Sequence, residues 1–204
     1  ASTQYSAVSA QVGDTIVTSY SFPFDSLAGQ DALKYTVEAV QTYNRLFGPY
    51  PHSSLSVVEA DFLDGMEFEG LYFLSKGFYN IYDGQPGSYL GAIAVHETAH
   101  QWWYSQVGND QAKEPWLDEA LCTYSEYLFF EANYPDAIPW WQQVRVAFYE
   151  PQGKVDGAID EYNGYVPYRN AVYLRGALFL HELRQVVGDE AFFGALQGLT
   201  DEFR

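Results

Sequence analysis

The chain contains a single cysteine, Cys122, among its 204 residues, so no disulfide can form within it. Basic residues are also scarce, because 10 Lys and Arg stand against 27 Asp and Glu and give a formal net charge of −17. No stretch is apolar over the roughly 20 residues that a membrane-spanning helix needs. These absences argue against nucleic-acid, anionic-membrane and transmembrane functions. They leave the compartment open between cytoplasmic and exported or cell-surface.

Aromatic residues are abundant instead. They make up 18% of the chain, with 18 Tyr, and hydrophobic residues as a whole make up 48%. These values are typical of a globular protein with an ample core, and the length suits one large domain or two lobes. The excess of acidic residues has two interpretations. It is more simply a property that keeps the protein soluble, and it less strongly indicates a substrate with a cationic amino terminus.

The strongest chemical signal is the segment His96-Glu97-Thr98-Ala99-His100, followed after eighteen residues by Glu119. On a helix, His96 and His100 share a face, so both imidazoles can reach one metal ion. A carboxylate on a second, returning helix can complete the set. Two neutral nitrogens and one carboxylate suit Zn²⁺ and leave a coordination position open, as in catalytic sites. We therefore expect one Zn²⁺ held by His96, His100 and Glu119, with Glu97 as general base beside it.

The alternative is a helix that carries two histidines by chance. The apolar run 89–95 before the motif argues against it, because a buried helix does not normally place His, Glu and His together without partners. Glu126 lies seven residues after Glu119 and could accept the outer N–H of a ligand histidine. A plain surface glutamate is as compatible with the sequence, and Asp118 or Glu114 could serve instead.

Residue periodicity predicts strands first and helices later, and hence an α+β fold. We expect a mixed β lobe over about residues 1–87 and an all-helical lobe over 88–204, with the active-site cleft between them. The predicted strands are 14–22, 55–60 and 71–74, and the predicted helices are 26–47, 89–107, 116–132, 139–148, 167–187 and 189–199.

The motifs HETAHQWW and WLDEALCTYSEY, with the eighteen-residue gap, resemble the gluzincin aminopeptidases, the family of aminopeptidase N (membrane alanyl aminopeptidase) and leukotriene hydrolase. The resemblance runs from about Asn44 to the C-terminus. It implies a thermolysin-like zincin catalytic domain that hydrolyses the N-terminal bond of peptides with a free N-terminus. Asp118 and Ala120 stand where the family usually has Asn and Gly.

Two tyrosines strengthen the resemblance. Tyr173 is followed by Leu174 and then by the pair Arg175-Gly176, and it matches the family's tyrosine that stabilises the oxyanion. Tyr168, five residues earlier, matches a second active-site tyrosine that some members have. The resemblance therefore adds Tyr173 as a catalytic residue and Tyr168 as a substrate-binding one.

Glu67 matches the glutamate of the family's G-x-M-E-N motif, which binds the substrate's α-amine. Backbone groups of Gly65 and Met66 would align the substrate main chain beside it. Asp64 and Phe68 replace the family's first Gly and its Asn, which changes the lining of the amine pocket.

Members of this family usually carry a β-rich domain before the catalytic domain and a helical domain after it, and neither fits here. We expect residues 1–204 to be a single metallopeptidase catalytic domain without its flanking domains, with apolar patches where those domains met it. Two other functions stay open: a zinc endopeptidase or epoxide hydrolase on the same scaffold, and a non-enzymatic peptide-binding module.

Overall fold

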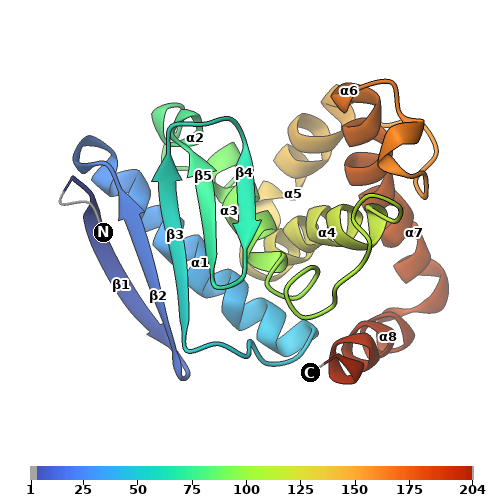
Figure 1. The fold of residues 1–204 in the computed structure, drawn as a ribbon, viewed down its shortest axis with the longest axis horizontal. Helices are drawn as coiled ribbons and strands as arrows, with labels where there is room; N and C mark the ends of the chain where they lie inside the picture. The colour runs from blue at the N-terminus through green and yellow to red at the C-terminus, as the bar shows by residue number, and fades with distance from the viewer. Residues whose placement is uncertain (1–3, 204) are drawn as a thin grey trace.

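A five-stranded sheet dominates the first part of the chain in the computed structural model, which describes residues 4–203 (Figure 1). Its order is β1-β2-β3-β5-β4. The three central strands β2, β3 and β5 are parallel, and the edge strands β1 and β4 pair antiparallel with β2 and β5 respectively. The strands are β1 (Ser6–Val12), β2 (Thr15–Ser21), β3 (Ser54–Ala60), β4 (Gly65–Phe68) and β5 (Leu71–Ser75). The edge strand β4 lies beside the helical part of the molecule (Figure 1).

The rest is helical. The α-helices are α1 (Ser26–Leu46), α2 (Lys76–Asn80), α3 (Tyr89–Ala99), α4 (Trp116–Asn133), α5 (Ile138–Trp140), α6 (Tyr165–Tyr168), α7 (Gly176–Val187) and α8 (Asp189–Glu202). Two π-helical segments continue α5 and α6, namely η3 (Trp141–Val146) and η6 (Arg169–Arg175). Short 3-10 turns complete the chain, at η1 (Pro23–Asp25), η2 (Pro135–Ala137), η4 (Ala147–Tyr149) and η5 (Ile159–Glu161).

The α+β class and the order of a β-containing part before a helical part are confirmed. Apart from the helix predicted over 89–107, the predicted strands and helices recur with small shifts at their ends, because their alternating or helical spacing matches the buried faces. The pattern missed β1 and β4. β1 is rich in Ser, Ala and Gln, which are weak strand formers, and pairing with β2 holds it in place. The exact lobe boundary stays a prediction.

Helix α3 is the central element. It packs against α1, α2 and α4 and against strands β4 and β5. Every residue of α3 after Tyr89 is buried. Ser88 caps its N-terminus by accepting a hydrogen bond from the Gly91 N–H at 3.2 Å. This burial explains the apolar run before the two histidines.

The prediction that this helix continues to residue 107 is wrong, because α3 ends at Ala99 and His100 is its C-cap. The chain then turns so that the two indoles of Trp102 and Trp103 enter the core. Trp102 Nε1 donates to Gly48 O at 2.8 Å, and Trp103 Nε1 donates to the Ser125 hydroxyl at 3.3 Å. Tertiary burial of the two rings therefore ends the helix.

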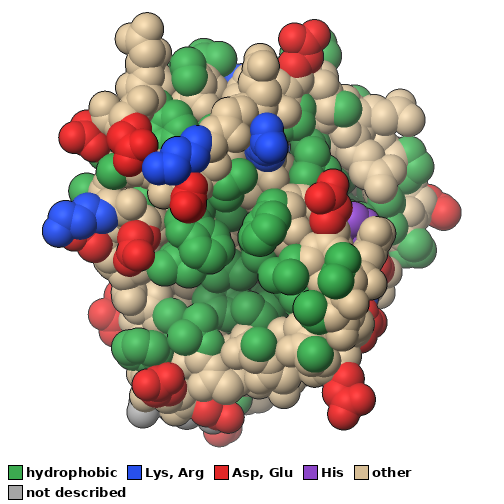
Figure 2. Space-filling view, turned by 90° about the vertical axis from the view of Figure 1, so that its right-hand side faces the viewer, with side chains coloured by type: hydrophobic (Ala, Val, Ile, Leu, Met, Phe, Trp, Pro, Cys, Tyr) green, Lys and Arg blue, Asp and Glu red, His purple; other side chains and the backbone are tan. Residues whose placement is uncertain are grey.

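Helix α7 lies at the right-hand edge of the molecule in Figure 1. Seen from that side, hydrophobic side chains gather over a hollowed face (Figure 2). On α7 the large exposed hydrophobic residues are Phe179, Leu183, Val186 and Val187. The outer surface is thus not uniformly polar. Among the described residues no helix is both long and apolar enough to cross a bilayer.

Candidate active site

Three side chains converge on one point, one from α3, one from its C-cap and one from α4. Oε2 of Glu119 lies 3.3 Å from Nε2 of His96 and 3.5 Å from Nε2 of His100, and the ligand atoms of all three lie within 4.8 Å of one another. Three ligands placed tetrahedrally at about 2.1 Å from one ion are about 3.4 Å apart. The donor set and its spacing therefore fit a single Zn²⁺.

Local structure delivers these three groups. His100 lies just beyond the last residue of α3, yet it keeps helical dihedral angles and its N–H donates to His96 O at 3.3 Å. The four-residue spacing therefore still places both rings on one side. Glu119 lies in the first turn of α4, where the helix dipole favours a carboxylate.

The outer nitrogen of His96 is held by a buried carboxylate. His96 Nδ1 lies 2.9 Å from Oε1 of Glu126, which is fully buried. Arg145 and Trp141, both in η3, donate hydrogen bonds to Glu126 at 2.8–3.0 Å. Glu126 is thus no surface glutamate, and it leaves Nε2 of His96 free to face the ligand point.

The outer nitrogen of His100 has two acceptors beside it. Nδ1 of His100 lies 3.1 Å from Trp103 O and 2.6 Å from Oδ1 of the buried Asp118. The other oxygen of Asp118 accepts a hydrogen bond from Gln111 Nε2 at 2.5 Å. The hydrogen bond of His100 Nδ1 is to Trp103 O, and Asp118 lies beside the ring as a charged neighbour, whereas Glu114 is exposed and takes no part.

Negative charge accumulates around the ligand point. Burial opposes a charged imidazole, but hydrogen bonds to Glu119 and Glu126 raise the pKa of His96 to about 9. Burial also opposes a charged carboxylate, yet the two imidazoles hold the pKa of Glu119 well below its usual range. Arg145 offsets one carboxylate, that of Glu126. The carboxylates gathered here are Glu67, Glu97, Asp118, Glu119 and Glu126. A bound dication reduces this imbalance.

Glu97 lies at the centre of the site with one oxygen unsatisfied. Burial raises the pKa of Glu97 to about 8, and the carboxylates of Glu67 and Glu119 add to the shift while the imidazoles oppose it. Its Oε2 is buried and has no hydrogen-bond partner among the described residues. Native proteins rarely leave such an atom alone, so it indicates a water or substrate group.

The glycine of β4 makes room for this base. A Cβ atom at Gly65 would lie 2.1 Å from Oε1 of Glu97, closer than any real contact. Any side chain at this position would displace the carboxylate. The preceding residue, Asp64, has a φ of 68°, a backbone conformation that favours glycine and tolerates aspartate.

A cleft of about 760 Å³ opens over these residues. One wall is strand β4 with Gly65, Met66 and Glu67, and the other is a face of α6 and η6. Carboxylate oxygens of Glu67 lie within 4.8 Å of ligand atoms of both His100 and Glu119. All three predicted substrate-binding residues of β4 thus line the cleft.

Tyr173 covers the ligand point from the helical wall. Its ring stacks on that of His96, with centroids 5.9 Å apart and an angle of 4° between the planes. Burial, followed by the Glu119 carboxylate, raises its pKa well above 10. The hydroxyl therefore keeps its proton at neutral pH and can donate a hydrogen bond. Tyr168 packs edge-on against Tyr173 at 5.5 Å and does not line the cleft, so its binding role stays a prediction.

Sequence reasoning missed four contributors, all brought in by tertiary structure. Trp141 and Arg145 support Glu126 from η3, and their four-residue spacing was the one available signal. Tyr165 and Arg169 line the cleft on the same helical face as Tyr173.

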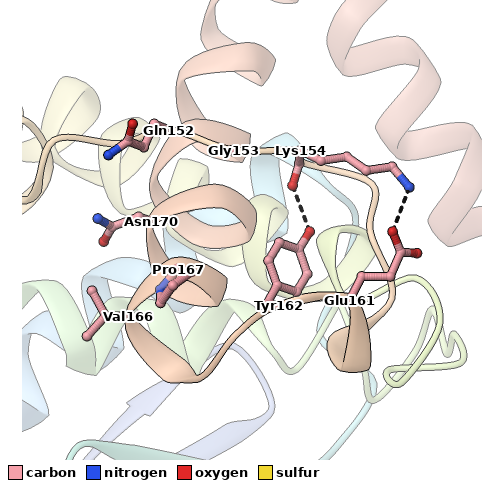
Figure 3. A pocket seen from close by; sticks show the side chains of 8 residues that line it. All are labelled: Gln152, Gly153, Lys154, Glu161, Tyr162, Val166, Pro167 and Asn170. Carbon is pink, nitrogen blue, oxygen red and sulfur yellow. Dashed lines mark hydrogen bonds and ion pairs between the residues drawn. The ribbon is translucent and has the colours of Figure 1, made fainter.

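A second pocket, of about 480 Å³, lies under the loop between η4 and α6 (Figure 3). Lys154 Nζ pairs with Glu161 Oε2 at 3.1 Å across its rim, and the Tyr162 hydroxyl donates to Lys154 O at 2.7 Å. These groups satisfy one another and hold the loop in shape. The cleft at the two histidines is therefore the candidate active site.

Known proteins match this chain in sequence and in fold. The Peptidase family M1 domain matches residues 31–204. Aminopeptidase M1-D of Oryza sativa subsp. japonica is 31% identical over 122 residues, which are 56% of this chain and 14% of that protein. Puromycin-sensitive aminopeptidase of Caenorhabditis elegans is 27% identical over 128 residues, which are 59% of this chain and 14% of that protein.

Among solved structures, an M1 zinc metallopeptidase from Deinococcus radiodurans superposes with a TM-score of 0.65 and 25% identity. The superposition covers 98% of this chain and 44% of that one. The match therefore covers only 14% of the length of these two curated relatives and less than half of the length of the solved structure.

Proposed function

Since this chain belongs to peptidase family M1, we propose that it is the catalytic part of a zinc-dependent aminopeptidase that removes the first residue of peptides. The names of its aminopeptidase relatives support this proposal. The observation that carries it is the convergence of His96, His100 and Glu119 at the spacing that zinc requires. The relatives do not favour an endopeptidase, an epoxide hydrolase or a non-enzymatic module.

His96, His100 and Glu119 would hold the ion. When bound, Zn²⁺ supplies Lewis acidity, which polarises a carbonyl group and lowers the pKa of water. Hydrogen bonds at Nδ1 orient the two rings, from His96 to Glu126 and from His100 to Trp103 O, and the Asp118 carboxylate adds a negative charge beside His100. The protein thus contributes three fixed ligands that line the cleft.

Glu97 moves the proton. Its unsatisfied Oε2 accepts a proton from the attacking water as the new C–O bond forms. The same carboxyl group then gives this proton to the nitrogen of the leaving amine as the C–N bond breaks. The Tyr173 hydroxyl donates a hydrogen bond to the oxyanion, and one such donor contributes about 2.7–4 kcal/mol to the transition state.

Glu67 accounts for exopeptidase specificity. Its carboxylate lies beside His100 and Glu119 and would pair with the substrate's α-ammonium group. Backbone groups of Gly65 and Met66 would align the first residue along β4, and Tyr168 would support Tyr173 from behind. A fixed distance between the amine anchor and the reaction centre then selects the first peptide bond.

The flanking partners belong to this proposal as well. Large apolar residues of α7 are exposed, and hydrophobic side chains gather over a hollowed face on the right-hand side of the molecule (Figure 2). Apolar patches of this kind mark contact surfaces. The solved structure that the chain matches is more than twice as long. We propose that parts of the longer protein cover this face.

The test compares alanyl and leucyl p-nitroanilides with their N-acetylated forms, with zinc and with a chelator present. We expect zinc-dependent cleavage of the free-amine substrates and little cleavage of the acetylated ones. Glu67→Ala should reduce cleavage of free-amine substrates and abolish this preference. Its matched control is Glu69→Ala, since the Glu69 carboxylate is exposed and pairs with His52. Equal rates on free and acetylated substrates would contradict the aminopeptidase assignment.

A further inference from the structure

One helical face lines the wall of the cleft opposite β4. Tyr165, Arg169 and Tyr173 follow one another at four-residue intervals along α6 and η6, and all three line the cleft. Tyr173 stacks on His96 at the ligand point. Arg169 therefore lies four residues, or about one turn of this π-helical segment, further along the cleft wall.

The direction of this displacement follows from contacts at the two ends of β4. Glu67 lies beside His100 and Glu119, whereas the Tyr165 hydroxyl donates to Oδ2 of Asp64 at 3.1 Å. Asp64 immediately precedes β4, whereas Glu67 lies near the other end of the strand, so the two contacts mark opposite ends of β4. Arg169 therefore lies on the side away from the amine anchor, where the leaving part of the substrate would extend.

The guanidinium group of Arg169 is held in place but not neutralised. Its Cζ lies 4.1 Å from the centroid of the Tyr149 ring, and Nε and Nη2 both donate to Asn170 Oδ1, at 3.1 and 2.8 Å. A guanidinium group has five N–H donors, so three are left for a ligand. Among the residues that the structure describes, no carboxylate forms an ion pair with Arg169.

Arg169 is a cation at this end that no carboxylate pairs with among the described residues. Arg145 is paired with Glu126, and the Asp64 carboxylate keeps its charge but accepts from the Tyr165 hydroxyl and from the Gly65 N–H at 3.2 Å instead of pairing with Arg169. The opposite end carries Glu67, with Asp118 and Glu119 behind it. The cleft is thus acidic where the amine would bind and has a free guanidinium group beyond the reaction centre.

We propose that Arg169 binds a carboxylate on the leaving-group side, so that the enzyme prefers peptides with an anionic group one or two residues beyond the scissile bond. That distance follows because an extended chain advances about 3.3–3.6 Å per residue. The carboxylate is either the C-terminus of a dipeptide or tripeptide or an acidic side chain. This inference rests on the proposed aminopeptidase function and specifies its substrate class.

The test measures kcat/KM for pairs of substrates that differ in one charge. Ala-Ala-Ala against its C-terminal amide tests the terminal carboxylate, and Ala-Asp-Ala amide against Ala-Asn-Ala amide tests the side chain. An Arg–carboxylate hydrogen bond corresponds to about a 10- to 100-fold preference for the charged member of a pair. Arg169→Gln should reduce the preference to about twofold or less.

Arg175→Gln is the matched control, because Arg175 lies on the same helical segment, is exposed and does not line the cleft. It removes the same charge and should leave the preference intact. A wild-type preference below about twofold in both pairs, or one that survives in Arg169→Gln, would overturn the inference while the aminopeptidase assignment stands.

Failure of the function itself is distinguished by binding. In the Glu97→Gln variant, calorimetry compares the affinities of Ala-Ala-Ala and its amide without turnover. Tighter binding of the acid that is lost on adding Arg169→Gln supports the inference even if no substrate is cleaved. Equal affinities for acid and amide would contradict it.

Discussion

The Nδ1 atom of His96 lies 2.9 Å from Oε1 of Glu126, a carboxylate that is fully buried and also bound by Arg145 and Trp141. His100 has a comparable neighbour, because Asp118 contacts its Nδ1 at 2.6 Å. Each of the two histidines therefore has a buried carboxylate beside its Nδ1 atom, which increases the basicity of the ring.

The two supporting carboxylates should control zinc affinity. We expect Glu126→Gln and Asp118→Asn each to weaken zinc binding by about 10- to 100-fold, measured by competition with a chromophoric chelator. Both replacements keep the shape of the side chain. Glu114→Gln, a change at an exposed neighbour, is the control and should bind zinc like the wild type. Unchanged affinity in both buried variants would show that these carboxylates serve only packing.

Replacing the base should separate binding from chemistry. Glu97→Gln keeps the size of the side chain but cannot accept a proton, so we expect kcat to fall by about 10²- to 10⁴-fold while zinc content stays at the wild-type level. Turnover within a few fold of the wild type would remove Glu97 from its proposed role. Zinc analysis of the same sample excludes loss of metal as the cause.

The hydroxyl of Tyr173 should act in the transition state. Tyr173→Phe keeps the ring that stacks on His96 and removes the donor, so we expect kcat to fall by about 10²- to 10³-fold with little change in KM. Tyr162→Phe is a suitable control, since the Tyr162 hydroxyl donates to Lys154 O in the loop outside the cleft. A change confined to KM would assign Tyr173 to substrate binding instead.

A buried carboxyl group outside the cleft should make stability depend on pH. Burial raises the pKa of Glu59 to about 7, and Asp25 adds to the shift. Below about pH 4.5 the group is protonated in the folded and unfolded states alike. As pH rises from there to about 7, only the unfolded state loses this proton, so the free energy of unfolding decreases and this contribution is lost above that range.

The corresponding measurement is denaturant unfolding of wild type and Glu59→Gln between pH 5 and 8, both free of zinc. The stability of the wild type relative to the variant should decline with pH, by at most about 1.4 kcal/mol per unit. Glu69→Gln, at an exposed position, should follow the wild type. Parallel curves for wild type and Glu59→Gln would contradict the assignment.

The sequence predicted what depends on local spacing. His96 and His100 are one turn apart, and their relation needs no knowledge of the rest of the fold. Glu119 is reached through an eighteen-residue connection whose path was not predictable, because α3 ends early. The burial of Trp102 and Trp103 decides that end, and burial is a property of the whole core.

Contacts between distant segments were beyond prediction. The four-residue spacing of Trp141 and Arg145 does not identify Glu126 as their partner, and the need for glycine at position 65 appears only when β4 meets Glu97. The π-helical geometry of η6 likewise departs from the 3.6-residue repeat that the pattern assumes, and it carries both Arg169 and Tyr173.

The most direct test of the account is calorimetric titration of the metal-free chain with zinc, followed by assay of alanyl p-nitroanilide at each ratio. We predict one equivalent bound, activity that rises to a plateau at that equivalent, and loss of binding in a His96→Ala, His100→Ala double variant. Zinc binding that survives in the double variant, or activity independent of zinc, would contradict it.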